Sequence, residues 1–194
     1  MALLTKTYLF EKTKTASPYL SEGYIREFAV GSLINEKRAV ASTQTFDIFL
    51  SHSSEDAILI KALRDELVEL GFSTYVDWID DPQMDRSHVT KTTAETLRLR
   101  MGQCACLLFA TSDAAKKSVW MPWELGYMDA LRRARVGIVP IVPETPRTYE
   151  FHGQEYLGLY PYLDKTNSTL YMQTAIGVWV TLREWLDGEN PAPH

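Results

Sequence analysis

FDIFLSHSSEDAILIKALRDELVELG, residues 46–71, has the clearest pattern of secondary structure in the sequence. Its first six residues form a short apolar run typical of a buried strand, and SHSSEDA follows as a polar turn. Apolar side chains then recur at helical spacing until Gly71 ends the pattern. Ser53 and Asp56 stand three residues apart before this helix, as the two positions of a capping box do. The stretch predicts a strand, a turn and a helix, in that order.

The same order of strand and helix repeats along the rest of the chain. Strands are expected at 72–78, 104–110, 135–143 and 157–163, and helices at 92–101, 119–135 and about 174–186. Earlier in the chain, TYLF at 7–10 is expected to form a short strand or turn, and 21–37 has the pattern of a helix. Strands that alternate with helices predict an α/β fold with an open, mostly parallel sheet covered on both faces.

In such sheets, ligands bind outside the carboxyl ends of the strands. The turns after Leu50, Trp78 and Ala110 should therefore share one edge of the sheet. The expected helix at 119–135 follows the third of these turns.

Composition and charge exclude several classes of protein. Of the 194 residues, 45% are hydrophobic and 23% are charged, as in ordinary globular proteins. The net charge of −5 comes without a long run of either sign, so we expect neither nucleic acid nor a membrane as partner. No stretch reaches the roughly 18 to 20 apolar residues of a membrane span, and no signal peptide is evident. We expect a cytoplasmic protein with one domain and an extension.

The two cysteines, Cys104 and Cys106, lie in the apolar run CACLLFA. No second cysteine pair and no histidine cluster accompanies them, so the sequence offers no set of metal ligands. We interpret both as reduced thiols of the core.

VWMPWELGYMDA, residues 119–130, places one carboxylate, Glu124, among aromatic side chains. At helical spacing Trp120, Trp123 and Glu124 lie on neighbouring faces. Two interpretations are open from this pattern alone. The tryptophans could be core and Glu124 a charge near the helix start, or Glu124 could line a pocket.

Four motifs, taken together and in this order, resemble a TIR (Toll/interleukin-1 receptor) domain. They are FDIFLSHSSED, YVDW with its acidic loop, the S-x-W-x-x-x-E of Ser118, Trp120 and Glu124, and the IVPIV strand. The resemblance implies a flavodoxin-like sheet of five parallel strands with helices on both faces. It implies a TIR domain over 45–187. Residues 1–44 lie outside the resemblance as an N-terminal extension, and the last residues, 188–194, are expected to form a flexible tail.

The family contains adaptors, which associate through TIR contacts, and enzymes that split NAD between nicotinamide and ribose. In the enzymes the essential glutamate ends a W-x-x-x-E stretch, so the resemblance implies that Glu124 is catalytic and that Trp120 is the matching tryptophan. NAD is then a substrate, and no cofactor or metal is expected. The products would be nicotinamide with ADP-ribose or a cyclic ADP-ribose isomer.

The resemblance also implies residues that bind the substrate. Ser51, His52 and Ser53 match the nucleotide-contacting turn of the family, although helix capping is an alternative role for each. Asp77 and Trp78 match the start of the loop that covers the site and mediates assembly. As alternatives, Asp77 could form a turn and Trp78 could anchor the loop. DRSHV at 85–89 lacks the glycine that this loop usually has.

A single carboxylate is sufficient for this chemistry in principle. Glycosidases generally need a second carboxyl group to protonate the leaving alcohol. Nicotinamide starts as a cation and leaves neutral, so it needs no acid. The carboxylate can then stabilise the oxocarbenium-like ribose electrostatically.

Three functions are compatible with these residues. The first is an NAD-cleaving TIR enzyme resembling the stand-alone bacterial proteins of Thoeris-type antiphage defence. Its partners would be further copies of itself, a phage-derived trigger and a separate effector protein. The second is a non-enzymatic TIR adaptor, and the third is an enzyme similar to nucleoside deoxyribosyltransferases.

Overall fold

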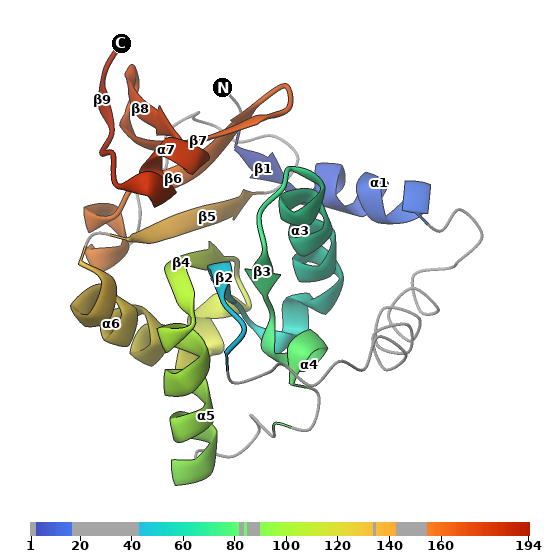
Figure 1. The fold of residues 1–194 in the computed structure, drawn as a ribbon. Helices are drawn as coiled ribbons and strands as arrows, with labels where there is room; N and C mark the ends of the chain where they lie inside the picture. The colour runs from blue at the N-terminus through green and yellow to red at the C-terminus, as the bar shows by residue number, and fades with distance from the viewer. Residues whose placement is uncertain (1–2, 17–42, 82–83, 85–89, 134, 143–154) are drawn as a thin grey trace.

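The computed structural model describes residues 3–16, 43–81, 84, 90–133, 135–142 and 155–194. Within these ranges nine strands form one sheet, and helices surround it (Figure 1). The strands are β1 (Leu4–Thr5), β2 (Phe46–Ser51), β3 (Thr74–Tyr75), β4 (Cys104–Thr111), β5 (Val136–Val142), β6 (Tyr162–Thr166), β7 (Thr169–Ala175), β8 (Val178–Thr181) and β9 (Ala192–Pro193). The α-helices are α1 (Lys6–Ala16), α3 (Ala57–Glu69), α4 (Asp77–Asp80), α5 (Lys91–Gly102), α6 (Trp120–Arg132) and α7 (Leu182–Asp187). Short 3₁₀ helices are η1 (Ser54–Asp56), η2 (Ala115–Lys117) and η3 (Glu155–Leu159).

Five parallel strands form the centre of the sheet, in the order β3-β2-β4-β5-β6. The predicted α/β fold with a five-stranded parallel sheet is confirmed. Because β2, β3 and β4 run in the same direction, their carboxyl ends lie at one edge, as predicted from the turns that follow them. The predicted strand at 72–78 is too long, because only Thr74–Tyr75 is paired and Asp77 begins α4.

The core divides into two clusters, and successive residues of the central strands alternate between them. Leu108 of β4 packs in one cluster with residues of α1, α3 and α7, whereas Leu107 and Phe109 pack in the other with residues of α5 and α6. Side chains of a strand point alternately to the two faces of its sheet. The predicted cover of helices on both faces is therefore confirmed.

The strand, turn and helix predicted from residues 46–71 are β2, η1 and α3. The predicted capping box is wrong in detail, because Ser53 Oγ accepts from the Glu55 backbone N–H at 3.4 Å and caps η1. α3 ends at Glu69, and Gly71 follows with φ of +86°. Glycine suits this place because a side chain disfavours the left-handed conformation.

The first described residues join the same sheet and the same core. β1 lies parallel to β5, with Leu4 opposite Ile141, and α1 lies beside α3 (Figure 1). The short strand or turn expected at 7–10 is wrong, because these residues belong to α1. Leu9 is fully buried in the core, so tertiary packing gives this helix its stability. The helix expected at 21–37 lies outside the described residues.

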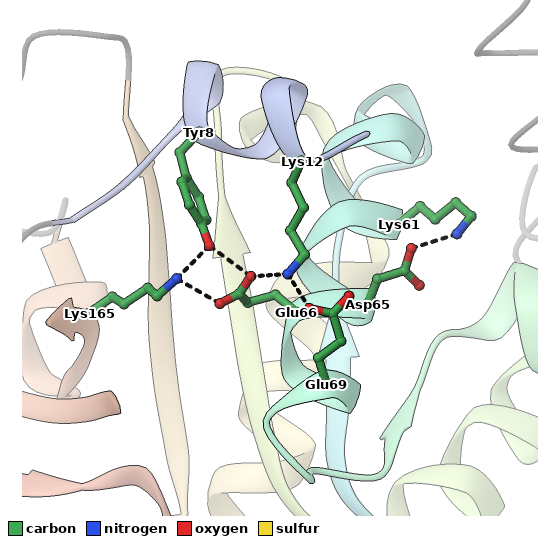
Figure 2. Close-up of polar contacts among 7 residues, drawn as sticks. All are labelled: Tyr8, Lys12, Lys61, Asp65, Glu66, Glu69 and Lys165. Atoms are coloured by element: carbon green, nitrogen blue, oxygen red, sulfur yellow. Dashed lines mark hydrogen bonds and ion pairs between the residues drawn. The ribbon is translucent and has the colours of Figure 1, made fainter. Parts of the chain in front are cut away.

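A cluster of charged side chains fixes α1 to α3 and β6 (Figure 2). The Glu66 carboxylate of α3 accepts hydrogen bonds from Lys12, from the Tyr8 hydroxyl at 2.8 Å and from Lys165 Nζ at 2.7 Å. Lys12 Nζ also lies 2.6 Å from Glu69 Oε2. Burial opposes ionisation of Glu66, but these hydrogen bonds outweigh it and lower the pKa of Glu66 to about 2.

The C-terminal part of the sheet is antiparallel, and the helix expected at about 174–186 is wrong over its first half. β6, β7, β8 and β9 pair antiparallel in sequence order. Two-residue loops join β6 to β7 and β7 to β8, with Asn167 at φ +55° and Gly177 at φ +75°. Asn and Gly are the residues that tight hairpins favour. The expected tail, 188–194, contains β9.

Cys104 and Cys106 are buried and free of disulfides, as predicted. Burial raises the pKa of both thiols, which makes them poor nucleophiles. No helix in the described ranges has the length and hydropathy that crossing a membrane requires.

Candidate active site

Glu124 lies on α6 with its side chain inside the protein. Its exposed fraction is 0%, and so is that of Ser51, the last residue of β2. Ser51 Oγ donates a hydrogen bond to Glu124 Oε2 at 2.6 Å. A hydroxyl that donates to a carboxylate at this distance makes a strong, charge-assisted bond and orients the carboxylate. The sheet edge and the helix thus meet at the glutamate that the sequence singled out.

His52 joins two of the turns predicted to share the sheet edge. Its Nδ1 lies 2.8 Å from the Leu50 carbonyl oxygen, and its Nε2 lies 2.7 Å from Trp78 Nε1. A carbonyl only accepts and an indole N–H only donates, so these two contacts fit the tautomer of His52 that carries its proton on Nδ1. Asp77 Oδ1 lies 3.4 Å from the same Nε2. Both ring nitrogens of His52 are therefore engaged within the protein.

The segment around α4 is fixed by the carboxylates of Asp81, which is buried, and Asp80, which is partly buried. The Asp81 carboxylate accepts from Arg100 Nε at 2.6 Å and Nη2 at 2.8 Å, and from the Tyr75 hydroxyl at 2.8 Å. Asp80 Oδ2 accepts from the Val76 backbone N–H at 2.7 Å. Burial raises the pKa of Asp80 to about 6, although the bond from Val76 favours the charged form.

Trp120 is mainly a core residue, since its exposed fraction is 6%. Its ring meets that of Trp123 edge to face, with centroids 5.6 Å apart. Trp123 in turn stacks on Tyr127 at 5.8 Å, and the Arg98 guanidinium lies over the Trp123 ring at 5.2 Å. The aromatic residues of α6 thus form a continuous row that begins in the core.

Ser112 is a residue of this sheet edge that the sequence analysis missed, and Asp56, which was assigned there to a capping box, is its partner. The Ser112 hydroxyl donates to Asp56 Oδ2 and accepts from the Ala115 backbone N–H at 3.1 Å. Ser112 directly follows β4, so the shared-edge rule places it beside the turn after β2. This rule could have indicated from the sequence that Ser112 lies near that turn, but it does not indicate that Asp56 is its hydrogen-bond partner.

Five of the seven predicted site residues form two groups, and the other two are Ser53 and the core residue Trp120. Ser51 is paired with Glu124, and His52 is paired with Trp78 beside Asp77. Ser53 caps η1. Their roles in binding a substrate stay predictions.

Among the described residues, no three His, Cys, Asp or Glu side chains are grouped so that they could hold a metal ion. The two histidines His88 and His152 lie outside the described residues.

Comparisons with known proteins identify the family of the chain. A family model described as "TIR domain" matches residues 48–189. The chain is 38% identical over 189 residues to "Probable 3′ cyclic ADP-D-ribose synthase ThsB′" of Bacillus cereus (strain MSX-D12), covering 94% of this chain and 90% of the relative. It is 31% identical over 93 residues to "Putative cyclic ADP-D-ribose synthase TIR2" of Cytobacillus dafuensis, covering 47% of this chain and 24% of that protein.

Proposed function

Because the chain belongs to the TIR domain family, we propose that it is an enzyme that cleaves NAD between nicotinamide and ribose, with Glu124 as the catalytic carboxylate. The observation that carries this proposal is the buried hydrogen bond between Ser51 and Glu124 at the carboxyl edge of the parallel sheet. Ligands of open α/β sheets bind at this edge. The 38% identity to a relative named as a 3′ cyclic ADP-D-ribose synthase supports the substrate class.

The carboxylate acts on the ribose side of the bond. The C1′–N bond breaks, its electron pair leaves with nicotinamide, and nicotinamide becomes neutral. The positive charge that develops on the ribose is stabilised by the carboxylate of Glu124, whose orientation Ser51 fixes. NAD is consumed as the substrate, and no resident cofactor takes part.

The nucleophile that attacks the ribose carbon decides the product. Water gives ADP-ribose, and a nucleophile within the same molecule gives a cyclic ADP-ribose. We favour the cyclic product, because both named relatives are described as cyclic ADP-D-ribose synthases. The product then serves as a signal in antiphage defence and acts on a separate effector in the cytoplasm, while a phage-derived trigger starts its synthesis.

Access to Glu124 requires a change in the structure. A side chain with an exposed fraction of 0% cannot touch a substrate, so the atoms that cover it must move before NAD reaches it. We propose that the structure represents the resting enzyme, and that association of several copies favours the open form. Full activity of a dilute, demonstrably monomeric preparation would contradict this part of the proposal.

The test compares the native chain with Glu124→Gln. Gln keeps the shape of the side chain and removes its charge, so a folded but inactive variant isolates the role of the carboxylate. Nicotinamide and the second product are identified by chromatography, at low and high protein concentration and with lysate of phage-infected cells. Glu95→Gln is the matched control, because Glu95 is an exposed carboxylate of α5 that pairs with Lys91.

We expect nicotinamide release by the native chain and by Glu95→Gln, and its loss in Glu124→Gln by at least about 100-fold, as for removal of a main electrostatic group. If none of the three proteins consumes NAD under any condition, the adaptor becomes the leading hypothesis. Exchange of free bases on nucleosides would instead indicate the deoxyribosyltransferase-like enzyme.

A further inference from the structure

The Ser112 hydroxyl acts both as a donor and as an acceptor of hydrogen bonds inside the protein. It donates to Asp56 Oδ2 and accepts from the Ala115 backbone N–H at 3.1 Å. The exposed fraction of Ser112 is 7%, so water competes little for either bond. The bridge joins segments 56 positions apart in the sequence.

The two bridged segments lead directly to the two partners of the candidate site. Asp56 is in the turn after β2, five positions beyond Ser51. Ser112 begins the segment that runs through η2 to α6, where Glu124 is in the second turn. The segment therefore determines where α6 starts. A shift of this start would change the distance between Ser51 and Glu124.

α6 depends on this segment because its own N-terminus is weakly capped. Val119, the N-cap residue, makes no capping hydrogen bond through its side chain. Ser118 Oγ accepts from the Met121 backbone N–H at 3.3 Å, which is long for a hydrogen bond. The bonds of Ser112 are thus a buried polar restraint on the segment before this helix, in addition to the core packing of Ala115 and Trp120.

We propose that Asp56 and Ser112 are positioning residues, which hold the segment before α6 so that the carboxylate of Glu124 stays in register with Ser51. This inference rests on the proposed NAD-cleaving function for its kinetic consequence, but its structural consequence stands without that function. Neither residue needs to touch the substrate. Their effect passes through the backbone from residue 112 to residue 124.

The chain contains a matched control for this bridge. Lys117 Nζ and Glu55 Oε2 lie 3.4 Å apart and link the same two segments, but the side chains are 72% and 56% exposed. Exposed ion pairs contribute little, because water and salt screen them. Glu55→Gln therefore removes a contact between these segments without removing the buried bridge.

The experiment uses the full chain and four variants: Ser112→Ala, Ser112→Thr, Asp56→Ala and Glu55→Gln. The first readout is kcat and KM for nicotinamide release, under the condition in which the native chain is active. The second readout is hydrogen–deuterium exchange of peptides that cover residues 112–125, which needs no substrate. Thermal unfolding shows that each variant is folded at the assay temperature.

We expect Ser112→Ala and Asp56→Ala to lower kcat by about 10- to 100-fold, the usual consequence of a small misplacement of a catalytic group, with KM changed by less than about two-fold. Ser112→Thr keeps the hydroxyl and should recover most of the native kcat. Exchange over 112–125 should be faster in Ser112→Ala and native-like in Glu55→Gln.

Unchanged kcat in a folded Ser112→Ala, or an equal loss in Glu55→Gln, would overturn the proposal. So would equal activity of the Ala and Thr variants, because the hydroxyl would then be irrelevant. Absence of NAD cleavage by the native chain is a failure of the proposed function instead. In that case only hydrogen–deuterium exchange over 112–125 tests the positioning role, and native-like exchange in Ser112→Ala rejects it.

Discussion

Ser51 Oγ and Glu124 Oε2 lie 2.6 Å apart although 73 positions separate the two residues in the sequence. The bond joins the carboxyl end of β2, which has β3 and β4 on its two sides, to the helix that packs on β4 and β5. A central strand is held on both sides, so it is a rigid support for a catalytic group. Two substitutions of serine test the importance of this support.

Ser51→Ala is expected to lower kcat for nicotinamide release by about 10- to 100-fold, because hydrogen bonds to charged groups contribute about 1.5–3 kcal/mol. Ser73→Ala is the control. Its hydroxyl donates to Asp47 at 2.9 Å at the other end of β2, and the bond is exposed. Steady-state kinetics of the two variants check the prediction. A similar loss of kcat in both would show that the Ser51–Glu124 bond has no specific role in catalysis.

The cluster around Glu66 predicts a loss of stability in acid. The pKa of Glu66 is about 2 in the folded protein, below its ordinary value of 4.5, so the folded state binds the proton more weakly than the unfolded state. Its contribution, about 2 to 3 kcal/mol, is complete above pH 4.5 and is lost as the pH falls toward 2. Urea unfolding of the native chain and of Glu66→Gln as a function of pH checks this. The difference between them should shrink in acid, and a constant difference would contradict the prediction.

Asp80 predicts the opposite pH dependence. Burial raises its pKa from 3.8 to about 6, so the folded state binds the proton more strongly, and stability falls as the pH rises through this range. Asp80→Asn removes the charge and keeps an oxygen that can accept from the Val76 N–H. We expect the variant to be more stable than the native chain at pH 8, by about 1–2 kcal/mol, and about equal to it near pH 3. A variant that is less stable at pH 8 would argue that the charge of Asp80 is needed.

Two glycines predict opposite effects of the same substitution. Gly71 has φ of +86°, so Gly71→Ala should destabilise the protein by about 1–2 kcal/mol. Gly126 lies in the interior of α6, and a Cβ added there meets no atom within 4 Å. Gly126→Ala should therefore stabilise by about 0.5–1 kcal/mol through helix propensity. Thermal unfolding of both variants shows whether each is more or less stable than the native chain. A change in the same direction for both would exclude this conformational explanation.

The central part of the fold could be predicted because its signals are local. The stretch from Phe46 to Gly71 has its own apolar pattern and its own stop, and the structure reproduces it as β2, η1 and α3. The hairpins after β6 were missed because Asn167 and Gly177 were not considered as turn residues. α1 was missed because the packing of Leu9 and the partners of Glu66 come from distant parts of the chain.

The candidate site was predictable to the level of the sheet edge. Parallel strands bring the turns after β2, β3 and β4 together, so that Ser51, His52 and Trp78 could be assigned to one region. The pairing within the region was not predictable, because it depends on side-chain directions. Nothing in the sequence indicates that His52 accepts from Trp78, or that Ser51 rather than its neighbours meets Glu124.

The charge cluster on α1 also bears on how the chain can be shortened. A fragment that starts at residue 45, the limit expected from the sequence motifs, would lose Lys12 and Tyr8 while Glu66 stayed on α3. It would also uncover the part of β5 that β1 pairs with. The smallest fragment that keeps all partners of Glu66 must therefore begin before Tyr8, and one that also keeps the pairing of β1 with β5 must begin before Leu4. An excised domain without these residues should be less soluble and more easily proteolysed.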